Sequence, residues 1–287
     1  MPLSPTAAVV AAAVRERRGV GAFNVIQLEH AYALVEGAER AGTAVILQIS
    51  ENCVRYHGSL EPIALATLAV ARAATVPVAV HLDHVQSPDL VDEGIALGIG
   101  SVMFDASTLP YADNVDLTRE ITDRCHAAGV FVEAELGEIG GKDGVHAPGV
   151  RTDPAEAAAY VAATGVDALA VAVGSSHAML TRDAVLDLEL IARLADTVPV
   201  PLVLHGSSGV PDDQLTAAVR AGMTKVNIAT HLNKTFTASV RGTLDAQPSL
   251  VDTRKYLGPA RTATTTEVTR LLGVLNAVPA TSIGVRA

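Results

Sequence analysis

The sequence is poor in aromatic residues, in cysteine and in positive charge, and each shortage excludes a class of protein. There is no tryptophan, and only 3% of the 287 residues are aromatic. The two cysteines, Cys53 and Cys125, lack the spacing of a disulfide framework, so we expect reduced thiols. Asp and Glu (31) outnumber Lys and Arg (21), and the formal charge of -10 argues against a general nucleic-acid or anionic-membrane surface.

Long uninterrupted apolar runs are missing as well. Charged residues, glycine or proline interrupt every hydrophobic stretch before it reaches the roughly 20 residues that a membrane helix needs. The first five residues show no basic region followed by an apolar segment, so no targeting peptide is expected. We therefore expect a cytoplasmic protein that does not span a membrane.

The chain does contain a regular alternation of two kinds of segment. Short apolar runs rich in β-branched residues alternate with Ala-, Leu- and Glu-rich segments of helical period, which is typical of repeated βα units. Most runs are continuously apolar, as expected of parallel strands buried on both faces. Eight runs are predicted as strands: Val20 to Ile26, Ala44 to Ser50, Val78 to Asp83, Ser101 to Asp105, Val130 to Leu136, Ala168 to Val173, Leu202 to Gly206 and Lys225 to Ala229.

The segments between these runs carry the signals of helix ends. Ser87-Pro88 and Asp153-Pro154 each place an N-cap residue before a proline at the first helical position. Eight strands of similar length without a linker favour a closed barrel over a doubly wound sheet. We predict an α/β fold in which residues 1–287 form a single (β/α)8 (TIM) barrel domain, with extra terminal helices near 5–17 and 264–277.

Polar residues occupy the C-terminal ends of the predicted strands, which is where (β/α)8 barrels form their active sites. Any one of them could simply mark the exit of a strand from the core, but this explains the whole set poorly. The histidines at the ends of strands three, six and seven could converge on one metal ion that keeps open coordination positions. The polar strand ends are Asn24, Ser50, Asp83, His84, Asp105, Glu133, Glu135, His177, His205, Asn227 and Thr230.

The remaining histidines are not expected to bind the metal. His81 alternates with Asp83 on one strand face, and we expect it to brace the site by a hydrogen bond. The others are interpreted as surface or structural residues: His30, His126 and His231 in helical patterns, and His57 and His146 in loops.

Two neighbouring segments have the character of a phosphate site, because free backbone N–H groups gather at glycine-rich turns and helix N-termini. Gly206-Ser207-Ser208-Gly209 follows the seventh strand, and Asn227-Ile228-Ala229-Thr230 leads from the eighth strand into a helix. Barrels commonly hold phosphate at this place. The glycine-rich segment 137–144 follows the fifth strand and is either a mobile lid or an ordinary connection.

Seven short motifs, in order and on the right strands, resemble those of the class II, metal-dependent fructose-bisphosphate and tagatose-bisphosphate aldolases. The resemblance spans nearly the whole chain. The motifs are Ala22-Phe23-Asn24, His81-Leu82-Asp83-His84, Phe104-Asp105-Ala106-Ser107, Val132-Glu133-Ala134-Glu135-Leu136-Gly137, Val173-Gly174-Ser175-Ser176-His177, Leu204-His205-Gly206-Ser207-Ser208 and Lys225-Val226-Asn227-Ile228-Ala229-Thr230.

The resemblance implies a zinc-dependent aldehyde-lyase that acts in carbohydrate metabolism, in glycolysis. It would reversibly cleave fructose or tagatose 1,6-bisphosphate into dihydroxyacetone phosphate and glyceraldehyde 3-phosphate. The implied metal site consists of the zinc ligands His84, His177 and His205, the general acid/base Asp83, and Asp105 and Glu135, which mark a second cation position, divalent or monovalent, or steer the substrate.

The resemblance also implies how the substrate is held. One phosphate would lie on Gly206, Ser207 and Ser208 together with Asn227, Ala229 and Thr230, while Asn24 and Ser50 would contact the sugar. Arg254 would reach the other phosphate of a neighbouring subunit, in a homodimer or homotetramer. Many relatives carry Glu before the Asp of segment 137–144, whereas this chain has Lys142. Proton exchange on the three-carbon half would therefore fall to Asp143 or to Glu138, or would be slow.

Other functions remain open on the sequence alone. An aldolase of the same family could act on another phosphorylated sugar or sugar acid, and a metal-dependent phosphosugar epimerase would gather similar residues. A Schiff-base aldolase would use Lys225 as its nucleophile. A barrel kept only as a scaffold would have lost its base or a ligand, and nothing is missing from Asp83, His84, His177 and His205.

Overall fold

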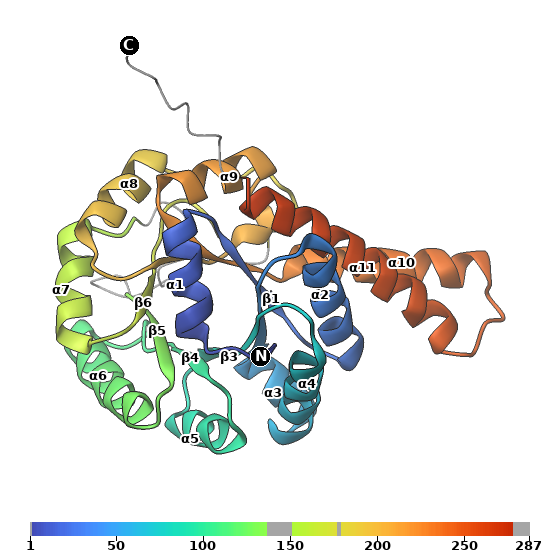
Figure 1. Ribbon diagram of the computed structural model, residues 1–287, viewed down its shortest axis with the longest axis horizontal. Coiled ribbons are helices and arrows are strands. Elements are labelled where there is room, and N and C mark those ends of the chain that lie inside the picture. Colours follow the sequence, from blue (N-terminus) through green and yellow to red (C-terminus); the bar gives the residue numbers. More distant parts are fainter. Residues whose placement is uncertain (1, 137–150, 177–178, 278–287) are drawn as a thin grey trace, which may run out of the picture.

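Eight parallel strands close into a barrel in their order along the sequence (Figure 1). The computed structural model describes residues 2–136, 151–176 and 179–277. At least one helix lies between each strand and the next, so the predicted (β/α)8 barrel is confirmed. The strands are β1 (Val20–Asn24), β2 (Val45–Ser50), β3 (Val78–Val85), β4 (Ser101–Phe104), β5 (Phe131–Glu135), β6 (Ala168–Ala170), β7 (Leu202–Leu204) and β8 (Met223–Ile228).

Helices surround the barrel and extend it at both ends of the chain. The expected terminal helices are present as α1 and the second half of α11, which begins at Arg254 rather than near residue 264. In the part of the chain that is described, none of them combines the length and apolar character needed to cross a membrane. The helices are α1 (Thr6–Glu16), α2 (Leu28–Ala41), α3 (Glu51–His57), α4 (Glu61–Ala73), α5 (Pro88–Leu97), α6 (Tyr111–Ala127), α7 (Pro154–Thr164), α8 (Leu188–Thr197), the 3₁₀ turn η1 (Ser207–Gly209), α9 (Asp212–Ala221), α10 (Thr230–Ala246) and α11 (Arg254–Leu275).

The predicted strands 168–173 and 202–206 are too long, because pairing stops at Ala170 and Leu204. Residues 171–173 stay buried after β6 ends, so their sequence still looks like a strand. The Val171 N–H still donates to Val203 of β7, but the backbone groups of Ala172 are used elsewhere: Ala172 accepts from the Thr152 N–H at 3.0 Å and donates to Thr152 Oγ1 at 2.8 Å. The chain thus leaves the barrel wall early and becomes a buried loop.

The described histidines outside the site lie in helices. His30 is structural: it is buried in α2, and this burial lowers its pKa to about 4. His57 was wrongly assigned to a loop, since it is the last residue of α3. That short helix starts because the Ser50 hydroxyl accepts the Cys53 N–H at 3.2 Å and caps it. The two histidines expected in other helices lie in α6 and α10, and His146 lies outside the described residues.

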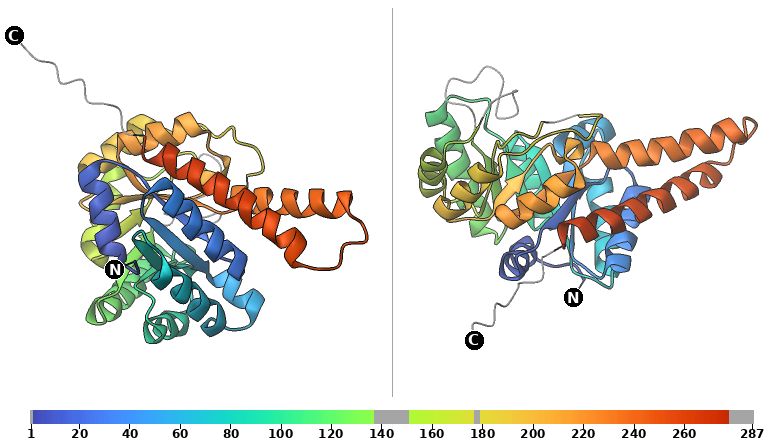
Figure 2. Two further views of the ribbon diagram at one scale, coloured as in Figure 1. Left: turned by 45° about the vertical axis from the view of Figure 1, so that its right-hand side comes forward. Right: turned by 90° about the horizontal axis from the view of Figure 1, so that it is seen from above.

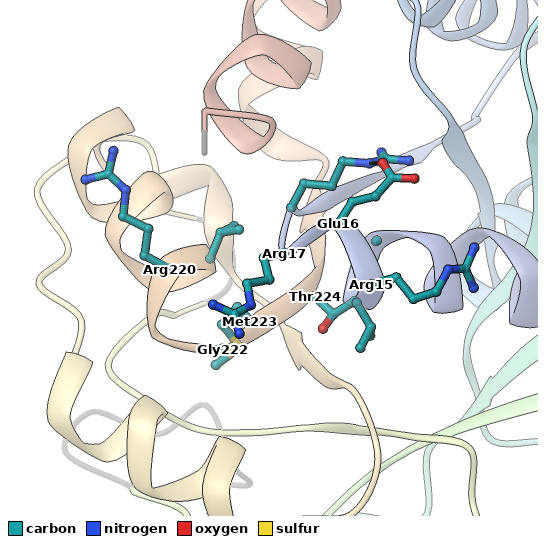
Figure 3. Close-up of a pocket in the computed structure, with 11 residues that line it drawn as sticks. Arg15, Glu16, Arg17, Arg220, Gly222, Met223 and Thr224 are labelled. Carbon is teal, nitrogen blue, oxygen red and sulfur yellow. Dashed lines mark hydrogen bonds and ion pairs between the residues drawn. The ribbon is translucent and has the colours of Figure 1, made fainter. Parts of the chain in front are cut away.

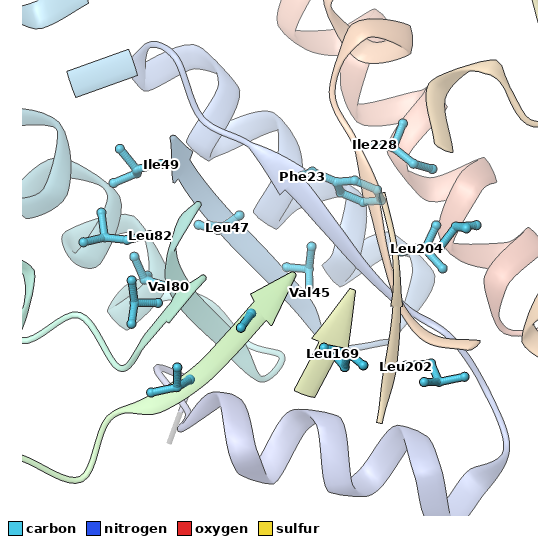
Figure 4. Packing of buried hydrophobic residues seen from close by; sticks show 14 of the residues in the cluster. Phe23, Val45, Leu47, Ile49, Val80, Leu82, Leu169, Leu202, Leu204 and Ile228 are labelled. Carbon is cyan, nitrogen blue, oxygen red and sulfur yellow. The ribbon is translucent and has the colours of Figure 1, made fainter. Parts of the chain in front are cut away.

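The outward faces of the strands form the main core of the molecule. Successive side chains of a strand point to opposite faces, and Val45, Leu47 and Ile49 of β2 pack together with Val80 and Leu82 of β3 (Figure 4). Helices cover this apolar surface. The chain therefore buries its β-branched residues between the barrel wall and the helix layer.

The inward faces of the strands change in character from one end of the barrel to the other. At the N-terminal end, Ala22, Ile46 and Ala79 are paired in register and form a small apolar cluster with α1. One step further along the same faces stand Gln48 and His81, also paired in register and fully buried. The interior is thus apolar and closed by α1 at one end, and polar at the end where the site lies.

Helices α10 and α11 pack against each other and project beyond the barrel (Figures 1 and 2). The returning helix α11 then runs over α2, where Gly37 allows a close approach. A Cβ atom built on Gly37 would lie 2.5 Å from Val268 Cγ1 and 3.0 Å from the carbonyl oxygen of Thr265. Helix α2 therefore needs glycine at this position for packing.

We predict opposite effects for alanine at two helical glycines. Gly37→Ala should lower the free energy of unfolding by about 1–2 kcal/mol, because overpacking outweighs the gain of about 1 kcal/mol in helix propensity. Gly242→Ala in α10 is the matched control, since a Cβ there meets nothing within 4 Å and the variant should be slightly stabilised. Urea unfolding measures both, and equal stabilities would contradict the packing argument.

Candidate active site

An irregularity in β3 presents two successive side chains to one site. The pairing register of β3 with β4 shifts between Leu82 and Val85, and His84 has a left-handed backbone with φ of 50°. Such a conformation costs on the order of 1–3 kcal/mol in a non-glycine residue and persists only where its surroundings hold it. In a regular strand, Asp83 and His84 would point to opposite faces. Here both line the same cavity.

Glu51 holds the chain that follows this irregularity. Its Oε2 accepts the backbone N–H of Gln86 at 2.6 Å and lies 3.4 Å from that of Ser87, while Oε1 is 2.5 Å from Arg55. Because Glu51 is nearly buried, these bonds tie the start of α3 to the end of β3. The sequence gives no signal for this role of Glu51, since Gln86 lies 35 positions away along the chain.

His84 is oriented by a carboxylate on the neighbouring strand end. Its Nδ1 lies 3.0 Å from Asp105 Oδ2, and the other oxygen of Asp105 accepts from the backbone N–H and hydroxyl of Ser107. Burial opposes the protonated ring, but the charge of Asp83 and the bond to Asp105 raise the pKa of His84. Carboxylates commonly orient imidazole ligands of metals in this way.

His205 is held between two carboxylates from β5. Its Nδ1 lies 2.9 Å from Glu135 Oε2, and its Nε2 lies 2.9 Å from Glu133 Oε1. Burial opposes protonation, but the bonds to Glu133 and Glu135 outweigh it and raise the pKa of His205 to about 10. The anionic surroundings that favour a proton on this ring also favour a cation beside it.

His81 lies below this cluster and contacts other groups. Its Nδ1 is 2.8 Å from the Ser101 hydroxyl, and its Nε2 is 4.0 Å from Glu133. Burial, followed by the charge of Lys225, lowers the pKa of His81 to about 3, so the ring is neutral. This position suits the bracing role expected from the sequence.

The donor atoms of Asp83, His84 and His205 come close enough together to hold a metal ion. One ligand atom from each lies within 4.8 Å of the others, and the two imidazole rings are 4.9 Å apart between centroids. Imidazole and carboxylate donors backed by further carboxylates suit zinc and similar divalent ions. The third predicted zinc ligand, His177, lies outside the described residues, as do Asp143 and Glu138, the candidates for proton exchange on the three-carbon half.

A cavity of about 200 Å³ lies beside these donors, at the C-terminal ends of the strands. Every residue predicted to hold the substrate lines this cavity except Ser207 and Arg254. Asn52 also lines it and was not predicted from the sequence, although it stands only two positions after Ser50 at the same strand end. The lining residues are Asn24, Ser50, Asn52, Asp83, His84, Gly206, Ser208, Asn227, Ala229 and Thr230.

Ser208 joins the two segments predicted to bind phosphate. Its hydroxyl oxygen accepts the backbone N–H groups of Ala229 at 3.3 Å and His231 at 3.1 Å, at the N-terminus of α10. Gly206 has φ of 66°, and a Cβ there would lie 2.6 Å from the Ser176 carbonyl carbon. The turn is therefore packed against both α10 and the end of the segment that follows β6.

Two residues predicted for substrate binding lie away from the cavity. The Ser207 side chain turns inward, and its hydroxyl donates to the Leu204 carbonyl at 3.0 Å, which satisfies a buried oxygen. Arg254 stands at the start of α11 in the projecting helix pair, where its exposed guanidinium pairs with Asp252 at 2.9 Å. Within one chain, neither side chain contributes to the lining.

A cavity of about 640 Å³, larger than the one beside Asp83, lies at the N-terminal side of the barrel instead (Figure 3). It is formed where α1 and α9 end, and arginines and apolar side chains line it. Arg18 there pairs with Glu16 and bonds the Thr43 hydroxyl at 3.0 Å. Residues at this end of a barrel serve stability, and this cavity offers no acid/base cluster like that around Asp83.

Comparisons with known proteins agree with this geometry. The family model described as "Fructose-bisphosphate aldolase class-II" matches residues 4–279. The chain is 39% identical to a fructose-bisphosphate aldolase of Geobacillus stearothermophilus over 255 residues, which cover 88% of this chain and 89% of the relative. It is 38% identical to a probable fructose-bisphosphate aldolase of Bacillus subtilis over 267 residues, covering 92% and 94%.

Solved structures of aldolases also match this chain over nearly its whole length. The YdjI aldolase of Escherichia coli K12 matches with a TM-score of 0.84 and 31% identity, over 95% of this chain and 97% of that chain. A putative fructose-1,6-bisphosphate aldolase of Coccidioides immitis matches with a TM-score of 0.81 and 28% identity, over 94% and 96%. The chain therefore belongs to the class II fructose-bisphosphate aldolase family, whose members are lyases.

We predict that Ser208→Ala lowers the free energy of unfolding by about 1 kcal/mol, the usual effect of losing a helix N-cap. The cause is the loss of an acceptor for the N–H groups of Ala229 and His231. Ser249→Ala, in the exposed turn between α10 and α11, is the control and should change little. Chemical denaturation compares them, and a Ser208→Ala protein as stable as the control would show that this bond does not hold α10.

Proposed function

We propose that this class II aldolase cleaves fructose 1,6-bisphosphate reversibly into dihydroxyacetone phosphate and glyceraldehyde 3-phosphate, with zinc at His84, His177 and His205. The observation that carries the proposal is the convergence of Asp83, His84 and His205 beside a cavity bounded by the turn after β7 and the start of α10. The names of the two bacterial relatives favour fructose as the sugar. Tagatose 1,6-bisphosphate differs at a single carbon and is the second candidate.

Asp83 is the group proposed to move the proton. Burial alone would raise its pKa, but the charges of His84 and Lys225 outweigh this and lower the pKa, so the carboxylate is ready to accept a proton. It would take the proton from the substrate hydroxyl during cleavage and return it to the aldehyde oxygen during condensation. Its Oδ1 lies 3.4 Å from Asn227 Nδ2, a contact that limits its rotation.

The imidazoles fit a divalent ion by their donor chemistry and by their supporting carboxylates. A bound divalent ion would act as a Lewis acid that stabilises negative charge on the carbonyl oxygen of the three-carbon half. Asp105 would keep His84 oriented for it. Both ring nitrogens of His205 contact a carboxylate, so one contact must give way and the ring must lose its proton when His205 becomes a ligand.

The turn Gly206-Ser207-Ser208-Gly209 and the N-terminus of α10 are proposed to hold one phosphate of the substrate. Gly206, Ser208, Ala229 and Thr230 surround the N-terminus of α10, where backbone N–H groups and the helix dipole favour an anion. Asn24 and Ser50 line the same cavity and would contact the sugar hydroxyls.

The proposals on proton exchange, on a second cation and on the assembly rest on the resemblance to the family. Asp143 would exchange the proton on the three-carbon half, and a second cation would lie near Asp105 and Glu135. Arg254 would act in the site of a second subunit, since it is exposed on the projecting helix pair, and the assembly would be a homodimer or homotetramer. We further propose that residues 1–287 act as one domain in the cytoplasm, in glycolysis.

Two of the alternative functions are disfavoured by the family match and by the position of Lys225. Membership in the aldolase family removes the case for an epimerase. Lys225, the nucleophile that a Schiff-base mechanism would need, is 1% exposed and does not line the cavity. An aldolase acting on another phosphorylated sugar or sugar acid remains the alternative.

The proposal predicts that the purified protein releases dihydroxyacetone phosphate from fructose 1,6-bisphosphate faster than from tagatose 1,6-bisphosphate. Treatment with a chelator should abolish the release, and zinc should restore it, because the three-carbon half depends on the ion for charge stabilisation. A coupled assay with both sugars measures this. Chelator-resistant cleavage would refute the metal mechanism, and inactivity toward both sugars in the presence of zinc would refute the substrate assignment.

Asp105→Asn is predicted to weaken zinc binding by roughly 10- to 100-fold, because an amide orients His84 less well and supports its basicity less. Asp92→Asn is the matched control: Asp92 is exposed and pairs with Arg124 at 2.9 Å on the outer helices. Calorimetric titration with zinc alone compares the two proteins. Equal affinities would mean that Asp105 does not support a ligand.

A further inference from the structure

We propose that Lys225 is a positioning residue of this site, which fixes the orientation of the Asn227 side-chain amide and thereby the contact of Asn227 with Asp83. Lys225 is not a ligand, a nucleophile or a proton carrier in the function proposed above. The inference rests on that function for its kinetic readout, but its geometric basis is independent of it.

Lys225 lies inside the barrel, where its ammonium group contacts Glu133 and Asn227. The side chain is 1% exposed, and Nζ is 2.8 Å from Glu133 Oε2 on β5. Nζ also donates a hydrogen bond of 2.9 Å to Asn227 Oδ1. Lysine is almost never buried without such partners, because removing an ammonium group from water is unfavourable unless it is paired.

The two residues share a face because of their spacing. Lys225 and Asn227 are two positions apart on β8, and alternate side chains of a strand point to the same side. Here that side is the barrel interior, with Asn227 nearer the C-terminal end and lining the cavity. Lys225 therefore supports Asn227 from below.

The chemistry of the ammonium group decides which way the amide faces. An ammonium can only donate hydrogen bonds, so the amide atom that faces Lys225 must be the oxygen of Asn227. The NH₂ group must then point to the other side, where Asp83 Oδ1 lies 3.4 Å away. The reversed amide would bring two donors together at Lys225 and two acceptors together at Asp83.

This orientation connects the proton-moving carboxylate to the other half of the site. Asn227 holds Asp83 by its NH₂ group, while Lys225 pairs with Glu133, whose other oxygen is 2.9 Å from His205 Nε2. Lys225 thus lies between Asp83 and His205 without contacting either in these bonds. Its loss should disturb turnover through Asn227 rather than through metal binding.

A double-mutant cycle tests whether Lys225 acts through Asn227. Lys225→Met, Asn227→Ala and the double variant are compared for kcat, for KM with fructose 1,6-bisphosphate, and for zinc affinity. We expect Lys225→Met to lower kcat roughly 10- to 100-fold, as for other small misplacements of catalytic groups, with zinc affinity changed less than about threefold. The double variant should fall within about threefold of Asn227→Ala alone, because coupled residues are not additive.

Independent effects would contradict the proposal. If the two losses in kcat multiply, or if Lys225→Met loses zinc as strongly as activity, Lys225 does not act by orienting Asn227. Lys255→Met is the matched control, since Lys255 is exposed on α11, and it should leave kcat, KM and zinc affinity unchanged. Lys225→Met removes the cation beside Glu133 Oε2 and leaves Glu133 with His205 alone, so if this variant does not fold, the whole cycle is repeated in a Glu133→Gln background.

Failure of the proposed function gives a different result from failure of this inference. A zinc-loaded wild-type protein that cleaves no ketose bisphosphate overturns the function, and the same cycle is then measured as calorimetric affinity for inorganic phosphate and dihydroxyacetone phosphate. Non-additive losses of that affinity support the role of Lys225, and additive or absent losses refute it.

Discussion

The pairing of buried charges inside the barrel is the constraint on which the rest of the site depends. Glu133 is completely buried, and it lies between His205 at 2.9 Å and Lys225 at 2.8 Å. Removing one partner of such a cluster typically costs about 3–5 kcal/mol, because a charge then remains buried without compensation. The charges are therefore tied to one arrangement, in which Glu133 orients His205 and Lys225 orients Asn227. The acid/base geometry around Asp83 follows from this arrangement.

The barrel tolerates these charges because its two ends differ. Apolar side chains point outward to the helix layer, while the inward faces begin with small apolar residues closed off by α1 and become polar toward the C-terminal end. The polar end also carries the irregularity at His84, which turns two successive side chains of β3 into one cavity. The rest of β3 pairs regularly with β2, so a local deviation can be held by a rigid frame. Position in the fold, more than residue type, makes Asp83 and His84 different from the polar groups on the outer helices.

The sequence was sufficient where the information is local. Runs of β-branched residues located all eight strands, and the polar residues at their ends located most of the cavity, since parallel strands in a barrel end at the same side. It was insufficient where distant contacts decide. The end of β6 depends on Thr152, and the roles of Glu51 and Lys225 appear only when β2, β3, β5 and β8 are side by side. The Ser207 hydroxyl bonds a carbonyl only three positions away, but the sequence does not show that this side chain turns inward rather than into the cavity. The helix ending at His57 was missed because a single hydroxyl, that of Ser50, starts it.

The central claim is that His84 and His205 belong to one metal centre beside Asp83. Anomalous diffraction at the zinc edge, from crystals of the zinc-loaded protein, tests it most directly. The account predicts a strong peak about 2.0–2.1 Å from one ring nitrogen of each histidine, the usual zinc–imidazole distance. A peak bonded to other residues, or none between these two rings, would contradict the metal site and the mechanism built on it.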